Sequence, residues 1–293
     1  MPRPSPQTDR IIRLLQLLAD QPDEARSLAE ISRFLGVAKP TCYPMLATLT
    51  DAGWLVRHPT KKTYRLGPAL IPLGSSAADS LDVVALARPL MGELADETAM
   101  TCIAALPSGI GLVLGEIIHP SRGGRRDLSV RVGDRFPARP PSGFGLAAWS
   151  PEEVLNEWLD RGAEHLGVSR DHLRAQYAPS LETVRRRGFS VECLMATGDA
   201  DPLTNLRGLG LAGRPGVFGL LDGLTRIEIV DEIEPSSEYQ PLSISSPVFG
   251  PDGLPVLLLS VTDAVEVIRG DRLIDICGHL KRVTDTLSES LRH

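Results

Sequence analysis

Apolar residues recur with helical spacing near the start of the chain. Four of them stand at the i, i+3, i+4 and i+7 positions of one helix face: Ile11, Leu14, Leu15 and Leu18. This spacing predicts an amphipathic helix over 9–20, which Pro22 ends. Ser27 and Glu30 form a capping-box pattern, in which the serine hydroxyl accepts from the glutamate amide and the carboxylate returns the bond. A second helix over 28–35 follows, with an apolar face of Leu28, Ile31 and Leu35.

A glycine turn and a third helix come next. Gly36 can adopt the left-handed backbone conformation that a tight turn after a helix requires. Pro40 suits the first turn of a helix, where its missing N–H would be unsatisfied anyway. Leu46 and Leu49 give this helix an apolar side, and Gly53 ends it. Two helices joined by a short turn with a glycine predict a helix-turn-helix.

A short hairpin with basic residues at its tip follows the third helix. The segments 54–57 and 63–66 are predicted strands, and the residues between them form a turn. Lys61 and Lys62 lie in this turn, and Arg65 lies on the second strand. In such a wing, the three cations would contact DNA phosphates while the third helix enters the major groove, where base edges are distinguishable.

The rest of the chain alternates between helical and strand patterns after a connector over 68–79 that contains prolines, a glycine and small residues. Predicted helices cover 82–97, 143–149, 151–160, 169–187 and 271–291. Predicted strands lie near 100–106, 110–118, 127–132, 189–194, 226–231, 242–249 and 254–262. The apolar face of the first helix includes Val83, Leu86, Leu90 and Leu94. Strands mixed with segregated helices predict an α+β domain.

Length and composition limit the classes of protein. The 293 residues, 42% hydrophobic and 23% charged, allow two domains with separate cores and argue against disorder. No apolar run reaches the roughly 18–20 residues of a membrane span, and the polar start of the chain lacks a signal-peptide stretch. The scattered cysteines indicate neither a zinc site nor a disulfide framework: Cys42, Cys102, Cys193 and Cys277. We therefore expect a cytoplasmic protein without metal or cofactor.

Charge is distributed unevenly. Residues 1–74 hold ten basic and six acidic side chains, a net charge of +4, which leaves −10 for the rest of a chain whose total is −6. A DNA-binding module joined to an acidic domain shows such asymmetry.

The sequence over 27–55, together with Tyr64-Arg-Leu-Gly67, resembles the isocitrate lyase regulator (IclR) family of transcriptional regulators. The resemblance implies a winged helix-turn-helix over 1–67 that binds operator DNA, with contacts from Lys39, Thr41 and Tyr43, and dimers that pair into tetramers. Pro44 departs from the family, which has a basic or polar residue there, and a proline inside a helix removes a backbone hydrogen bond.

Weaker motifs extend the resemblance over 80–293, at 131–137, 187–189 and 243–256. They imply a GAF-like or profilin-like effector-binding domain. The residues that would line its pocket, carried over by motif, are Ser142, Gly143, Glu192, Ser243, Ser260 and Thr262. Hydroxyls and backbone amides there suit a carboxylate, to which Arg139 would add charge, so we expect an organic or aromatic acid as effector.

Two segments depart from the family pattern, and two functions other than a transcriptional regulator were weighed. The segment 139–145 differs from the family pattern, and 196–241 is longer and Gly-rich, predicted as an elaborated loop and short hairpin without assigned function. A winged-helix protein that acts through protein contacts, with weak or lost DNA binding, is the alternative. An enzyme is the other rival, but no nucleophile, base or metal motif supports it, so no catalytic residue is assigned.

Overall fold

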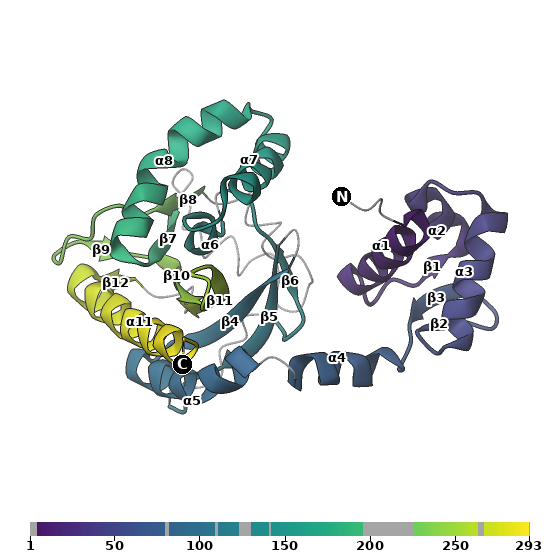
Figure 1. Cartoon of the computed structure of the whole chain (residues 1–293), viewed down its shortest axis with the longest axis horizontal. Coiled ribbons are helices and arrows are strands. Elements are labelled where there is room, and N and C mark those ends of the chain that lie inside the picture. Colours follow the sequence, from purple (N-terminus) through teal and green to yellow (C-terminus); the bar gives the residue numbers. More distant parts are fainter. Residues whose placement is uncertain are drawn as a thin grey trace. The chain divides into compact units, whose positions relative to one another are not determined.

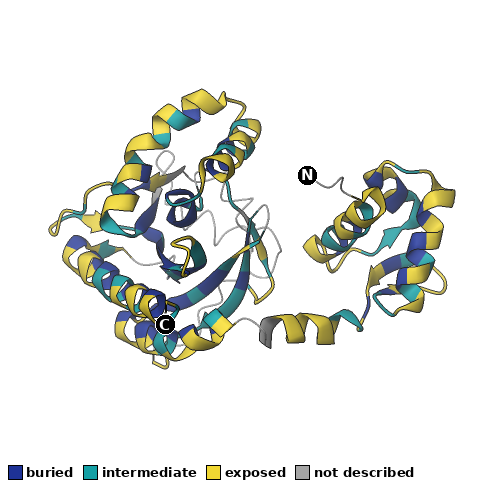
Figure 2. Cartoon of the chain, in the orientation of Figure 1, coloured by how far each residue is buried: buried dark blue, intermediate teal, exposed yellow. Residues whose placement is uncertain are grey.

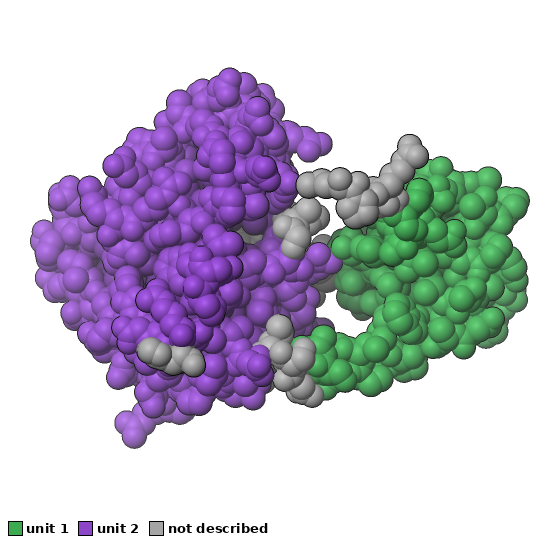
Figure 3. All heavy atoms as spheres, viewed as in Figure 1, with its two compact units in different colours: residues 1–81 green, residues 82–293 purple. Residues whose placement is uncertain are grey.

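A computed structural model describes residues 5–79, 82–108, 111–122, 130–140, 142–195, 226–262 and 267–292. The chain divides into two compact units, Met1–Leu81 (unit 1) and Asp82–His293 (unit 2), which are coloured separately in Figure 3. Of the loop and short hairpin predicted over 196–241, residues 196–225 lie outside the described residues, as do the predicted strand residues 127–129.

Unit 1 contains the predicted helix-turn-helix and hairpin (Figure 1). Its elements are α1 Pro6–Asp20, β1 Arg26–Ser27, α2 Leu28–Leu35, α3 Lys39–Asp51, β2 Leu55–Arg57, β3 Thr63–Leu66 and α4 Leu70–Asp79. The strands form a small antiparallel sheet in the order β1-β3-β2. The short strand β1 was not predicted, because two residues carry no periodicity.

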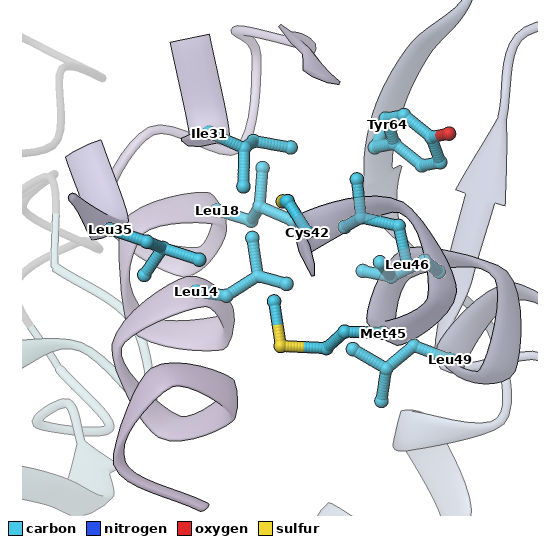
Figure 4. Close-up of a cluster of buried hydrophobic side chains, with 10 residues drawn as sticks. Leu14, Leu18, Ile31, Leu35, Cys42, Met45, Leu46, Leu49 and Tyr64 are labelled. Carbon is cyan, nitrogen blue, oxygen red and sulfur yellow. The ribbon is translucent and has the colours of Figure 1, made fainter. Parts of the chain in front are cut away.

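The core of unit 1 is built from the apolar faces of α1, α2 and α3. Figure 4 shows side chains from these helices meeting one another and Tyr64 of β3. The fully enclosed members are Leu14, Ile31, Cys42, Leu46, Leu55 and Tyr64. Each helix thus gives one side to the core and leaves the other to solvent (Figure 2).

Local signals fix the helix ends as predicted. The capping box is present: Ser27 N donates to Glu30 Oε2 over 2.8 Å, and Glu30 N donates to Ser27 Oγ over 3.3 Å. Gly36 has φ 66°, in the left-handed region, and its N–H bonds to the last turn of α2. These two signals set the start and the end of α2, and therefore the turn into α3.

Unit 2 is a curled seven-stranded sheet with helices on both faces (Figure 1). The strand order is β6-β5-β4-β11-β10-β7-β8, and its pairs are antiparallel. The strands are β4 Thr101–Ser108, β5 Gly111–Ile118, β6 Arg135–Pro137, β7 Ser190–Met195, β8 Arg226–Ile229, β10 Pro241–Phe249 and β11 Pro255–Thr262. The helices are α5 Asp82–Thr98, α6 Phe144–Ala147, α7 Glu152–Leu166, α8 Arg170–Arg187 and α11 Gly270–Ser290. A separate pair joins β9 Glu238–Tyr239 to β12 Ile268–Arg269.

The two sheet faces have different partners. Ser246 of β10 bonds Thr284 of α11 over 2.8 Å, so this face of the strand meets α11. Neighbouring strand residues point the opposite way, and the opposite face lies under α6. The α+β architecture is therefore as predicted, with α11 on one face of the sheet and α6 on the other.

Two predictions about unit 2 were wrong. The buried side of α5 is formed by Val84, Ala87, Met91, Leu94 and Ala95. Of the predicted apolar face, Leu94 lies on this buried side, whereas Leu86 is 48% exposed and Val83 and Leu90 are only partly buried. Both sets of residues have helical spacing, and the buried alanines were not counted as core because the prediction considered large apolar side chains only. Residues 130–132 form no strand, and the edge strand is β6 instead.

Candidate DNA interface and ligand site

The helix α3 exposes the residues that were predicted to contact DNA. Lys39, Thr41 and Tyr43 are all exposed, Tyr43 by 50%. The opposite side is held in the core by Cys42, Met45, Leu46 and Leu49. The packing of α3 therefore determines which side chains are presented to a partner.

Pro44 lies in the second turn of α3, and the helix continues through it to Asp51. A proline lacks the N–H that would bond the carbonyl four residues earlier, that of Pro40. The hydroxyl of Thr48 donates to the carbonyl of Pro44 over 3.0 Å. The other side of the helix packs in the core, and α3 is continuous through Pro44. Pro44 therefore changes the exposed surface of α3 and does not end the helix.

The turn between β2 and β3 is organised by His58. Its Nδ1 accepts from the backbone N–H groups of Thr60, over 3.2 Å, and Lys61, over 3.1 Å. Lys62 takes a left-handed φ of 53°, and its N–H bonds the carbonyl of His58 over 3.1 Å. Both lysines are exposed, so the wing tip carries two cations on a turn with defined backbone contacts.

Arginines anchor the sides of the wing. Arg65 Nη2 donates to the carbonyl of Asp23 over 3.0 Å, which ties β3 to the segment before β1. Arg57 lies over the ring of buried Tyr64, 5.8 Å from its centroid. Arg65 is exposed as predicted, with a backbone contact that the sequence did not indicate. Sequence reasoning also missed Arg57 and His58, although both stand in the basic hairpin.

In unit 2, three of the predicted ligand residues meet around one carboxylate. Glu192 of β7 lies opposite Ser243 of β10, whose hydroxyl donates to Glu192 Oε2 over 3.2 Å. The backbone N–H groups of Gly143 and Phe144, where α6 begins, donate to the same carboxylate. The protein's own carboxylate therefore occupies the amides that suit an anion.

Further hydroxyls line the same sheet face. Ser260 Oγ lies 2.7 Å from Ser245 Oγ, and Thr262 Oγ1 donates to the carbonyl of Leu242 over 2.6 Å. Ser190 is fully buried, and its hydroxyl has no hydrogen-bond partner among the residues the structure describes. Sequence reasoning missed Ser190 and Ser245. Both stand two residues from a predicted one, which is the spacing that places strand residues on one face.

The helix α6 lies tightly over this face. A Cβ on Gly145 would stand 2.7 Å from Leu258 Cδ1, 3.4 Å from Ser245 Cβ and 3.5 Å from Ser190 Oγ. Trp158 Nε1 donates to the carbonyl of Ser142 over 2.9 Å, and this contact holds the segment before α6. Ser142 itself is partly exposed. A ligand that enters here must move α6 or the Ser142–Gly143 segment.

Burial dominates the acid–base chemistry of Glu192. Its side chain is 6% exposed, and burial raises the pKa of Glu192 from 4.5 to about 7, although its three hydrogen bonds act in the opposite direction. The carboxyl can therefore change protonation near neutral pH when a charge approaches it.

The cysteine thiols, unlike Glu192, do not titrate near neutral pH. All four cysteines are buried, and burial raises the pKa of Cys102, Cys193 and Cys277 to about 12. Among the described residues, no group of three or more His, Cys, Asp or Glu side chains could hold a metal ion. In the same part of the chain, no single helix is long and apolar enough to cross a membrane.

Comparisons with known proteins agree with the helix-turn-helix found in unit 1. Residues 7–59 match the IclR helix-turn-helix domain. The chain is similar to the HTH-type transcriptional regulator XynR of Escherichia coli K12, with 27% identity over 188 residues, which cover 63% of this chain and 73% of that regulator.

Solved structures extend the likeness to the whole fold. An IclR transcriptional regulator from Alicyclobacillus acidocaldarius covers 99% of this chain and 100% of its own, with a TM-score of 0.67 and 24% identity. An IclR homolog from Microbacterium hydrocarbonoxydans, complexed with 4-hydroxybenzoate, covers 98% of this chain and 99% of its own, with a TM-score of 0.57 and 17% identity. The predicted order, a helix-turn-helix followed by an α+β domain, is thus confirmed.

Proposed function

We propose that the chain is a DNA-binding transcriptional regulator of the IclR family, that it binds an operator through unit 1, and that a small molecule bound in unit 2 changes this binding. One observation carries the proposal: α3 exposes Lys39, Thr41 and Tyr43 beside a wing tip that carries Lys61 and Lys62. A helix of this kind fits the major groove, while cations on a hairpin fit phosphates. We place the protein in the cytoplasm, where a bacterial operator lies.

We propose that the functional form is a homodimer, able to pair into a tetramer. A single helix-turn-helix reads few bases, and two copies on half-sites one helical turn apart supply the missing specificity. Apolar side chains exposed on three helices suit such contacts: Ile12 of α1, Ile71 of α4 and Leu86 of α5. Sedimentation at micromolar concentration tests the assembly. A strictly monomeric protein, with and without operator, would refute it.

We propose the domain limits 1–67 for the DNA-binding domain, 68–79 for the connector and 80–293 for the effector domain. The connector contains α4, a single helix. We propose that a signal from unit 2 passes along this connector and through the dimer. A ligand shifts that geometry only if it binds one arrangement more tightly than the other.

For the effector we propose an organic or aromatic acid, bound between Gly143 at the start of α6 and the sheet face that carries Glu192, Ser243 and Ser260. The complex of an IclR homolog with 4-hydroxybenzoate supports this class. Since Glu192 already occupies the amides at the start of α6, an acid would enter with a proton on Glu192, which its pKa of about 7 allows. Binding of the acid should therefore weaken as pH rises above 7.

Two experiments test the proposal. A gel shift with the DNA upstream of the chain's own gene tests operator binding. A retarded band that specific competitor removes supports it, whereas binding no better than to unrelated DNA favours a winged helix used for protein contacts. Small acids are then titrated into the complex of wild type and of Ser243→Leu, which removes the hydroxyl next to Glu192. We expect the variant to bind DNA but to ignore the acid. A normal response to the acid would place the ligand elsewhere.

A further inference from the structure

The exposed side of α3 has an unusual centre. Successive helical residues turn by about 100°, so the side opposite the core is centred on positions i, i+4, i+7 and i+11. These positions hold Pro40, Pro44, Ala47 and Asp51. Both prolines are exposed, and Ala47 is partly exposed. The first three, which we call the proline strip, lie where a recognition helix meets the floor of the major groove.

The proline strip offers no hydrogen bond to a base. Proline and alanine side chains have neither donor nor acceptor atoms, and a proline has no backbone N–H. The nearby hydroxyl of Thr48 already donates to the carbonyl of Pro44 over 3.0 Å, which turns its hydrogen away from a partner. The polar side chains of Lys39, Thr41 and Tyr43 stand to either side of the strip and close to the start of the helix.

We propose that the proline strip reads the operator by apolar contact with the 5-methyl groups of thymines. In the major groove this methyl group is the one apolar feature of a normal base pair, and it distinguishes an A·T pair by contact alone. The positive charge of unit 1 and the basic wing bring the helix to DNA, and the strip then selects half-sites with thymine opposite Pro44. This inference rests on the proposed function, since it presumes that α3 enters the groove.

The expected effect follows from the area of one methyl group. Burial of one CH₂-sized group at the interface stabilises the protein–DNA complex by about 0.8 kcal/mol, which corresponds to about a fourfold change in affinity. Replacing the contacted thymine by deoxyuridine removes only the methyl group and keeps the pairing. One such change should weaken binding about fourfold, and one in each half-site about fifteenfold.

The experiment begins with selection of duplexes from a random library by the full chain. Each thymine of the enriched duplex is then replaced by deoxyuridine, and affinity is measured by fluorescence anisotropy. Three proteins are compared: wild type, Pro44→Asn, and Lys62→Ala as a control at a phosphate contact. Circular dichroism melts confirm that each variant is folded.

In wild type, we expect replacement by deoxyuridine to weaken binding about fourfold at one or two thymines of each half-site. In Pro44→Asn, replacement at one of these thymines should no longer weaken binding. Lys62→Ala should weaken thymine and deoxyuridine duplexes equally, which leaves their ratio unchanged. Equal affinity of wild type for all the duplexes would overturn the inference while leaving DNA binding intact. An unchanged ratio in Pro44→Asn would also overturn it. A library from which no duplex is enriched would refute the proposed function itself, and this inference with it.

Discussion

The buried carboxyl of Glu192 should make the stability of unit 2 depend on pH in a way that one substitution removes. Glu192→Gln keeps the size of the side chain, lets its oxygen accept from Gly143 and Phe144, and cannot ionise. A carboxyl whose pKa rises from 4.5 to about 7 on folding holds its proton more tightly in the folded state. Its contribution to stability is therefore fully present below about pH 4.5 and is lost as pH rises through about 7.

The magnitude follows from the two pKa values. Across the whole pH range, the contribution of Glu192 to the free energy of unfolding changes by about 3 kcal/mol. About 2 kcal/mol of this change falls between about pH 5.5 and pH 8.5. Wild type should lose this amount over that range relative to Glu192→Gln. The comparison between the two proteins cancels the contributions of other titrating groups, since these are present in both.

Urea unfolding followed by tryptophan fluorescence measures the effect. Trp54 lies in unit 1, whereas Trp149 and Trp158 lie in unit 2, so a Trp54→Phe background restricts the signal to unit 2. Glu153→Gln, at an exposed position of α7, serves as the matched control and should behave as wild type. If the free energy of unfolding changed with pH in the same way in wild type and in Glu192→Gln, the raised pKa of buried Glu192 would be refuted.

Three further changes test other parts of the structure. Lys61→Ala with Lys62→Ala should weaken binding to all DNA sequences alike and flatten the salt dependence by about one to two units, and an unchanged slope would show that the wing tip stays off the DNA. Ser27→Ala removes the acceptor of the capping box and should lower the free energy of unfolding of unit 1 by about 1 kcal/mol in a urea titration. Gly145→Ala should destabilise unit 2 by about 1–3 kcal/mol because its Cβ meets Leu258. Gly278→Ala in α11, whose Cβ meets nothing within 4 Å, is the control and should be neutral or stabilising; equal effects would contradict the close fit of α6.

Unit 1 could be predicted almost residue by residue because its signals are local. The capping box at Ser27 and the left-handed Gly36 both act within one turn of chain, and the structure has α2 at the predicted bounds. The backbone contacts of His58 and Arg65 could not be predicted, because they depend on how the hairpin folds onto itself and onto the segment before β1.

Unit 2 was predictable in most of its elements, the edge strand β6 excepted, but not in its pairings. Strand positions followed from alternation, whereas the order β4-β11-β10-β7 depends on contacts between segments far apart in sequence. Glu192 and Ser243 were expected in one site, and they do meet. That Glu192 takes the amides of Gly143 and Phe144 follows only from the position of α6 on the sheet.

The central claim, that α3 and the wing recognise operator DNA, is tested most directly by one ratio. The affinity of the full chain for an enriched duplex is compared with its affinity for a scrambled duplex of the same composition, at physiological salt. A sequence-specific regulator should bind its own duplex at least about 10³-fold more tightly, and Thr41→Ala should reduce that ratio. Equal affinity for the two duplexes, with the protein folded and dimeric, would contradict the account.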